Sequence, residues 1–131
     1  MNRTVVYIED NEQNLYLVTY ILEHSGYRVV GARDGREGIA AARSERPALV
    51  LLDIQLPVMD GYAVARKLRE CPELAAVPIV ALTSYAMAGD RERALAAGCT
   101  GYIEKPINPE TFLAQIERHL GQAGAAAGAA P

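Results

Sequence analysis

Hydrophobic residues gather in five short runs of strand length, with longer segments of mixed polarity between them. The runs cover residues 4–8, 28–32, 48–52, 79–83 and 100–104. Strand-length runs that alternate with helix-length segments are typical of βαβ units, in which helices connect parallel strands. The first, third and fourth runs are almost wholly apolar, which predicts strands buried on both faces. We therefore expect an α/β protein with a parallel sheet and these three strands at its centre.

The segments between the runs predict helices. The first helix is marked by four apolar residues at helical spacing and by Gly26 as a stop signal; the four are Leu15, Val18, Ile21 and Leu22. Two further helices are predicted to end before Pro47 and before Pro72, because proline cannot continue a helix.

The last third of the chain predicts two more helices and a tail. Residues 88–97 are rich in charge and have only a thin apolar stripe, so we expect a weakly anchored fourth helix. The fifth helix is predicted to begin with Asn108 as N-cap and Pro109 at the first helical position. The Ala/Gly-rich segment 121–131 has no charge, which predicts a disordered tail or linker stub after a single domain spanning residues 1–120.

Composition excludes several classes of protein. The chain has 131 residues, of which 50% are hydrophobic and 22% are charged, as in a globular protein of one domain. Its net charge of -3 argues against direct nucleic-acid binding. Cys71 and Cys99 stand far apart without a metal-binding pattern, and no apolar run has the length of a membrane span. A cytoplasmic protein without membrane contact is the expectation.

Polar residues follow four of the five predicted strands. Glu9 and Asp10 come after the first strand, Asp53 after the third, Thr83 ends the fourth, and Lys105 follows the fifth. In an open α/β sheet the ligand site lies beyond the carboxyl ends of the strands. We therefore expect these side chains to meet at one edge of the sheet.

An edge with three carboxylates needs a compensating positive charge, because like charges a few ångströms apart repel one another. Oxygen ligands without His or Cys suit Mg²⁺, which keeps water ligands that a phosphate can replace. A carboxylate nucleophile, a hydroxyl and a lysine beside such an ion meet the requirements of phosphoryl transfer. The predicted cofactor is therefore Mg²⁺.

Four motifs give the chain a clear resemblance, from about residue 4 to residue 120, to the receiver domains of two-component response regulators. They are Ile8-Glu9-Asp10-Asn11, the run from Leu52-Asp53 to Asp60-Gly61, Ala81-Leu82-Thr83-Ser84, and Gly101-Tyr102-Ile103-Glu104-Lys105-Pro106. The resemblance implies a flavodoxin-like (βα)5 doubly wound fold with strand order 2-1-3-4-5.

The resemblance also implies a role for each site residue. Asp53 would accept a phosphoryl group from a phosphohistidine of a sensor histidine kinase or a histidine phosphotransferase. The ligands of Mg²⁺ would be Asp10, Asp53 and the Gln55 main-chain carbonyl, with Glu9 acting through water. Thr83 and Lys105 would contact phosphoryl oxygens, and a cis peptide at Lys105-Pro106 would aim the lysine inward.

Signalling is implied to follow from a conformational change. Thr83 would move toward the phosphoryl group and Tyr102 would rotate inward, so that the surface of the fourth helix, fifth strand and fifth helix changes for a downstream target protein. Such a protein is not an enzyme in the ordinary sense, because Asp53 is consumed and regenerated. It would be a monomer or a phosphorylation-dependent dimer.

Two residues depart from the family's pattern. Glu9 stands where many members have Asp, and Tyr85 is bulky beside the expected phosphoryl site; we expect Tyr85 and Gln55 to slow dephosphorylation by restricting water. The motifs resemble both single-domain receivers of the cell-division-control type and receivers attached to hybrid kinases, so a complete regulator and a fragment of a larger protein both stay open.

Two other classes of function compete with a receiver. A flavodoxin-like electron carrier shares the sheet order, but the acidic segment after the first strand would repel the phosphate of FMN. A metal-dependent phosphohydrolase with an aspartyl intermediate would release phosphate continuously.

Overall fold

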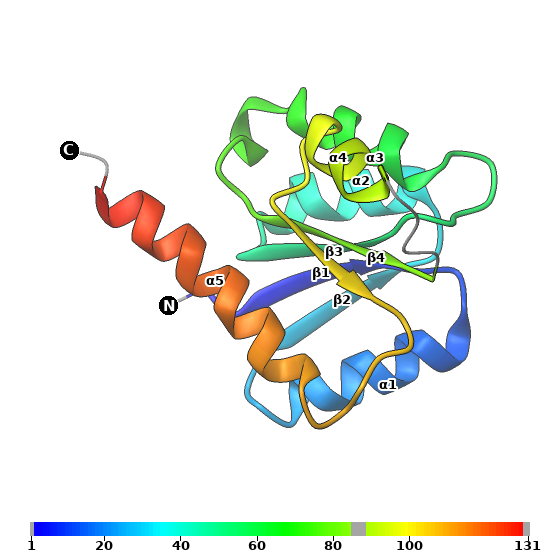
Figure 1. Ribbon diagram of the computed structural model, residues 1–131, viewed down its shortest axis with the longest axis vertical. Helices are drawn as coiled ribbons and strands as arrows, with labels where there is room; N and C mark the ends of the chain where they lie inside the picture. Colours follow the sequence, from blue (N-terminus) through cyan, green and yellow to red (C-terminus); the bar gives the residue numbers. More distant parts are fainter. Residues whose placement is uncertain (1, 85–88, 130–131) are drawn as a thin grey trace.

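Five parallel strands form one sheet in the order β2-β1-β3-β4-β5 (Figure 1). The computed structural model describes the chain from residue 2 to 84 and from 89 to 129. The strands are β1 (Thr4–Ile8), β2 (Arg28–Ala32), β3 (Leu49–Asp53), β4 (Ile79–Thr83) and β5 (Gly101–Glu104). The flavodoxin-like fold and its strand order are confirmed, and the apolar strands β1, β3 and β4 are the inner ones, as their composition predicts.

Within the described residues five helical segments lie between the strands, and a sixth follows β5. They are α1 (Glu12–Glu23), α2 (Gly35–Glu45), α3 (Gly61–Arg69), the short 3-10 helix η1 (Pro72–Leu74), α4 (Asp90–Ala96) and α5 (Phe112–Ala129). None of the helices within the described ranges is long and apolar enough to span a membrane.

Side-chain caps fix where the first three helices begin. Asn11, Asp34 and Asp60 each accept a hydrogen bond from the backbone N–H three residues further on, at distances of 2.9, 2.8 and 2.9 Å. Each cap satisfies one of the N–H groups that a helix start leaves without a backbone partner. The three caps follow β1, β2 and β3, so each connection turns into its helix close to the carboxyl edge of the sheet.

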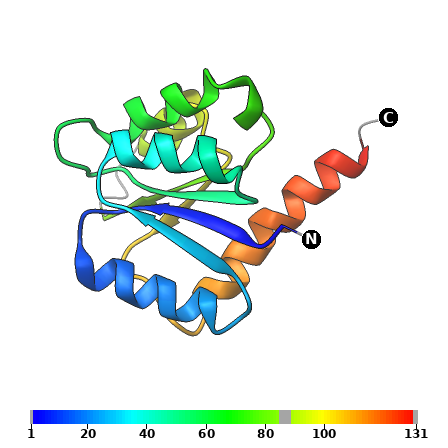
Figure 2. The same cartoon turned by 180° about the vertical axis from the view of Figure 1, so that it is seen from behind.

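The sheet separates two hydrophobic layers (Figures 1 and 2). Helices α2, α3 and α4 cover one face, where Val6, Ile8 and Leu52 are fully buried. Helices α1 and α5 cover the other face, where Tyr7 and Phe112 are fully buried. Side chains alternate between the faces along β1, as they do in any strand, so Tyr7 and Ile8 belong to different layers.

Several boundaries differ from the sequence prediction. Strand β3 begins and ends one residue later than predicted, so that Asp53 is its last residue, and β5 begins one residue later. Helix α5 begins at Phe112 rather than at Pro109, because Asn108 first closes a separate turn: its Oδ1 accepts from the Glu110 N–H, and its carbonyl accepts from the N–H groups of residues 111 and 112. The start of the predicted fourth helix lies partly outside the described residues, and α4 begins at Asp90.

Helix α5 runs on through Ala129 and so includes most of the segment predicted to be a disordered tail. Alanine is the strongest helix former, which is a physical reason for the helix to continue through an Ala-rich segment. The end of the domain at residue 120 stays a prediction.

Candidate functional site

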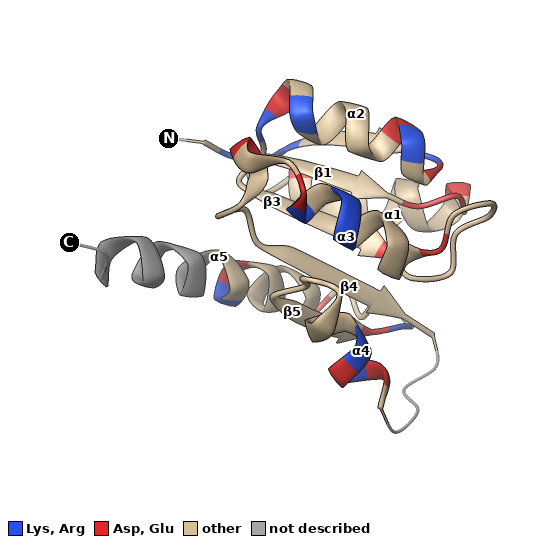
Figure 3. Cartoon of the chain, turned by 90° about the horizontal axis from the view of Figure 1, so that it is seen from above, with Lys and Arg blue, Asp and Glu red and all other residues tan. Residues whose placement is uncertain are grey.

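The predicted site residues lie at the carboxyl edge of the sheet. The parallel register pairs Ile8 with Leu52, Asp53 with Leu82, and Thr83 with Glu104, so four strands end at a similar level. Figure 3 shows acidic positions on the loops beyond the strand tips. Glu9, Asp10, Asp53, Thr83 and Lys105 all stand at or just after those tips.

Three carboxylates form a cluster at this edge. One oxygen from each of Glu9, Asp10 and Asp53 lies within 4.8 Å of the others. Glu9 is 1% exposed and Asp53 is 2% exposed, whereas Asp10 is open to solvent. The cluster, called the acidic pocket below, therefore combines two buried carboxylates with one exposed carboxylate.

Lys105 bridges the two buried acids. Its Nζ lies 3.0 Å from Glu9 Oε1 and 3.5 Å from Asp53 Oδ2. The Lys105-Pro106 peptide is cis, as predicted, and the Lys105 N–H donates to the Thr83 carbonyl at 2.7 Å. The backbone thus holds the lysine against β4 while its ammonium group reaches the acids.

Tyr7 is a further polar partner of the pocket, which the sequence analysis did not identify. Its ring is fully buried between α1 and α5, and its hydroxyl donates to Glu9 Oε1 at 2.8 Å. The available signal was a tyrosine among the aliphatic residues of the first strand, two residues before an acid and on the same side of the chain.

The buried acids perturb one another. Burial and the adjacent Glu9 carboxylate raise the pKa of Asp53 to about 7, against the opposing effects of the Gln55 N–H and Lys105. Burial also acts to raise the pKa of Glu9, but hydrogen bonds with Asp53, Lys105 and Tyr7 outweigh it and hold that pKa below its usual value. The two carboxylates therefore resist carrying their full charge together.

These residues fit a hard divalent cation. The three carboxylates bring three negative charges when ionised, and Lys105 compensates only one of them. All the donors are oxygens, which Mg²⁺ prefers over nitrogen and sulfur. A cation bound there would relieve the repulsion that raises the pKa of Asp53.

The loop after β3 holds Asp53 closely. The Gln55 N–H donates to Asp53 Oδ1 at 2.9 Å, and the Gly61 N–H donates to the Ile54 carbonyl at 2.9 Å. A Cβ added at Gly61 would stand 2.5 Å from Ile54 Cα and 2.7 Å from the Asp53 carbonyl oxygen. Only glycine allows this approach, so the last residue of the predicted phosphoacceptor motif also shapes the pocket.

Thr83 and Tyr102 occupy neighbouring strands. Thr83 is 4% exposed at the end of β4, next to the strand that carries Asp53. Tyr102 is half-buried on β5 opposite Ala81 and lines a hollow of about 280 Å³ with residues of α4 and α5, among them Arg91 and His119. Their predicted roles in switching stay predictions, and Tyr85 lies outside the described residues.

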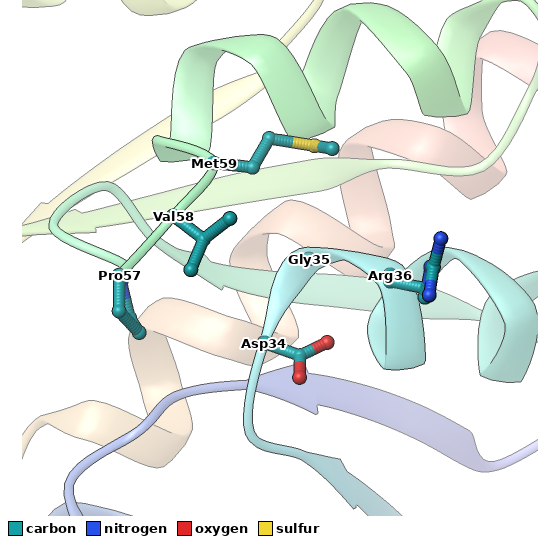
Figure 4. Close-up of a pocket in the computed structure, with 6 residues that line it drawn as sticks. All are labelled: Asp34, Gly35, Arg36, Pro57, Val58 and Met59. Carbon is teal, nitrogen blue, oxygen red and sulfur yellow. The ribbon is translucent and has the colours of Figure 1, made fainter.

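A second hollow, of about 400 Å³, lies between the start of α2 and the loop after β3 (Figure 4). The Asp34 carboxylate at its wall accepts a hydrogen bond from the Glu37 N–H as the cap of α2. Val58 in the facing loop is fully exposed and has a left-handed φ of 67°. None of the three clustered acids lines this hollow.

Comparison with known proteins agrees with this arrangement. The family model "Response regulator receiver domain" matches residues 5–117. The chain is 42% identical over 123 residues to the polar-differentiation response regulator DivK of Brucella anthropi, covering 94% of this chain and 100% of that protein.

Solved structures with the same fold include two receiver proteins. One is the receiver domain of the sensor histidine kinase PA1611 from Pseudomonas aeruginosa PAO1, with a magnesium ion in its active site cleft; it has 35% sequence identity, a TM-score of 0.83, and coverage of 92% of this chain and 99% of that chain. The other is the chemotaxis response regulator CheY4 of Vibrio cholerae, with 31% identity, a TM-score of 0.86, and coverage of 91% and 99%.

A family match over most of the chain, together with an acidic pocket at the expected edge of the expected sheet, decides against an electron carrier. The chain belongs to the response regulator receiver domain family, whose members serve phosphorylation-based signalling.

Proposed function

We propose that Asp53 is the phosphoacceptor of this receiver and that Mg²⁺ bound by the acidic pocket supports its phosphorylation. The observation that carries the proposal is the position of Asp53: it is buried, its carboxylate belongs to the three-acid cluster, and Lys105 Nζ stands 3.5 Å away. A phosphoryl group on Asp53 would therefore arrive beside a positive charge.

In the reaction, a carboxylate oxygen of Asp53 forms the bond to phosphorus while the bond from phosphorus to the donor's imidazole nitrogen breaks. The imidazole leaves with its electron pair and takes up a proton. Lys105 offers its ammonium group to a phosphoryl oxygen, and Thr83 offers its hydroxyl to another. The Gln55 N–H keeps Asp53 Oδ1 in place at 2.9 Å, which favours attack by the other oxygen.

Asp10, Asp53 and the Gln55 main-chain carbonyl would hold Mg²⁺, with Glu9 acting through water. When bound, the ion neutralises charge on the transferring phosphoryl group. Asp10 is the exposed member of the cluster, so the ion can enter from the solvent side.

The proposed donors are a sensor histidine kinase or a histidine phosphotransferase. A hollow of about 430 Å³ opens beside the site between α1 and the loop after β5; its lining includes Leu17, Lys105 and Ile107. An apolar wall next to the phosphate-binding lysine supports docking of a helix that presents a phosphohistidine.

Signalling would pass to a downstream target through the face formed by α4, β5 and α5. Only Ala94 of α4 is buried, so few contacts hold this helix in one position. Phosphorylation can shift the equilibrium between an inactive and an active conformation only if the phosphoryl group makes different contacts in each. Thr83 and Tyr102 are the side chains proposed to supply that difference. The protein is proposed to act as a switch and not as a turnover enzyme.

One experiment tests the central assignment. The protein is incubated with acetyl phosphate and Mg²⁺, and its intact mass is measured alongside Asp53→Asn and, as a matched control, Asp34→Asn. We expect a gain of one phosphoryl group in the wild type and in Asp34→Asn, no gain in Asp53→Asn, and no gain for any protein with excess chelator. Phosphorylation of Asp53→Asn would refute the assignment, and sustained release of phosphate would favour a phosphohydrolase.

A further inference from the structure

Glu9 is a buried glutamate whose side chain is held by Tyr7, Lys105 and the Asn11 N–H. Its carboxylate is almost fully buried at 1% exposure. Compared with aspartate, the extra methylene adds a rotatable bond, so a buried glutamate needs partners that fix its position.

Both strong donors to Glu9 reach the same oxygen. Tyr7 Oη lies 2.8 Å and Lys105 Nζ 3.0 Å from Oε1. The other oxygen, Oε2, accepts a longer hydrogen bond of 3.4 Å from the Asn11 N–H. This division leaves Oε2 as the oxygen with capacity to accept from a water in the shell of a cation.

The Tyr7 side chain is suited to fixing the position of the Glu9 carboxylate. Its ring belongs to the hydrophobic layer between the sheet and helices α1 and α5, with Val18, Leu22 and Phe112 in the same cluster. Its hydroxyl reaches past the layer to the acidic pocket. Tyr7 therefore joins a packed anchor to a carboxylate whose other contacts are the flexible Lys105, the Asp53 carboxyl group and a long backbone hydrogen bond.

We propose that Tyr7 is a positioning residue of the receiver site: its hydroxyl holds Glu9 with Oε1 on Lys105, which would leave Oε2 to accept from a water of a bound Mg²⁺. The inference rests on the proposed magnesium-dependent function. Without the hydroxyl, Glu9 samples other conformations, and binding of Mg²⁺ must first restore the productive one.

A double-mutant cycle with Tyr7→Phe and Glu9→Asp tests the inference. Mg²⁺ affinity is measured by calorimetry on the full chain. In the wild-type background we expect Tyr7→Phe to weaken Mg²⁺ binding about tenfold, the effect of losing one hydrogen bond to a charged group. In the Glu9→Asp background the shorter carboxylate lies out of reach of the phenol, so the same substitution should change the affinity less than about twofold.

Tyr27→Phe is the matched control. Tyr27 is also a buried tyrosine of this layer, but its hydroxyl contacts Glu117, away from the pocket. We expect it to leave Mg²⁺ affinity unchanged. Equal effects of Tyr7→Phe in both backgrounds, or no effect in either, would overturn the inference.

Two further results separate the possible failures. If the wild type binds no Mg²⁺ and takes no phosphoryl group, the proposed function fails; if it does both and Tyr7→Phe matches it, only the role of Tyr7 fails. Should Tyr7→Phe not fold, Glu9→Asp tests the contact from its other side: exchange of the Tyr7 hydroxyl proton with solvent, followed by NMR, should become faster, and an unchanged rate would count against the contact.

Discussion

Asp53 combines two demands that oppose each other at the scale of one residue. As the proposed phosphoacceptor it would need to lie in a site sheltered from water, and its burial beside Glu9 disfavours its charge. Lys105 offsets only part of this cost, because it is shared with Glu9. In metal-free protein the ionised form of Asp53 thus lowers the stability of the folded state.

This opposition predicts how stability depends on pH. The pKa of Asp53 is about 7 in the folded protein, above its ordinary value of 3.8, so the folded state holds the proton more tightly than the unfolded state. The Asp53 contribution to the free energy of unfolding is therefore largest below about pH 4 and is lost as pH rises to about 7, with a slope of up to about 1.4 kcal/mol per pH unit.

The comparison with Asp53→Asn isolates this contribution. Measured by urea denaturation in chelator, the variant should be more stable than the wild type at pH 8, and its advantage should shrink toward pH 5. Added Mg²⁺ should reduce the difference at pH 8 because the ion stabilises the ionised pocket. Parallel pH profiles for the two proteins would contradict the account.

At the scale of elements, the loop from β3 to α3 depends on Gly61. We expect Gly61→Ala to lower the free energy of unfolding by about 1–3 kcal/mol, because the added methyl overlaps backbone atoms of residues 53 and 54 that cannot move independently. Mg²⁺ affinity should fall with it, since Asp53 would be displaced.

Gly31→Ala is the control for that substitution. Its added methyl meets only the end of the Leu15 side chain, at 3.3 Å, so we expect a change of less than about 1 kcal/mol, measured by the same denaturation. A larger loss at Gly31 than at Gly61 would show that the close approach at Gly61 is not what constrains the loop.

The strands were predicted almost to the residue because most are apolar runs that give way to polar residues at their carboxyl ends, as β1 does at Glu9 and β4 at Ser84. The ends of the helices were harder to predict from the sequence. Asn108 forms a turn before α5, and propensity does not distinguish this turn from a first helical turn. Helix η1 was missed because Pro72, read only as the stop of α3, also begins a short helix.

The site was predicted in a similar way. Charged residues placed directly after strands converge by topology, so Glu9, Asp10, Asp53 and Lys105 could be grouped from the sequence. The sequence could not predict which atoms of these residues are in contact. The contact between Tyr7 and Glu9 depends on how deeply the Tyr7 ring is buried in a layer packed by residues far along the chain, such as Phe112.

At the scale of the whole molecule, Arg69 links three segments. Its Nε donates to the Gly98 carbonyl at 2.8 Å, and its Nη1 donates to the Leu74 carbonyl at 2.9 Å. The guanidinium thus joins the end of α3 to η1 and to the turn between α4 and β5. Removing the guanidinium would leave the partly buried Gly98 and Leu74 carbonyl groups without this donor, which lowers the stability of the folded state.

We expect Arg69→Met to lower the free energy of unfolding by about 1–3 kcal/mol while the side-chain stem keeps its packing. Arg43→Met is the control, because Arg43 pairs with Glu73 at the surface with 61% of its side chain exposed, and such pairs contribute less than about 1 kcal/mol. Thermal or urea denaturation checks both, and equal losses would argue against a linking role.

The edge strands of the sheet limit how two copies of the protein can associate. The outermost strands β2 and β5 have only five and four residues, and Arg28 on β2 is held in an ion pair with Glu45. Short edge strands with charged side chains oppose the addition of a strand from another molecule to the sheet. Pairing of two copies through their sheet edges is thereby disfavoured, and with it the growth of fibres by edge-to-edge addition.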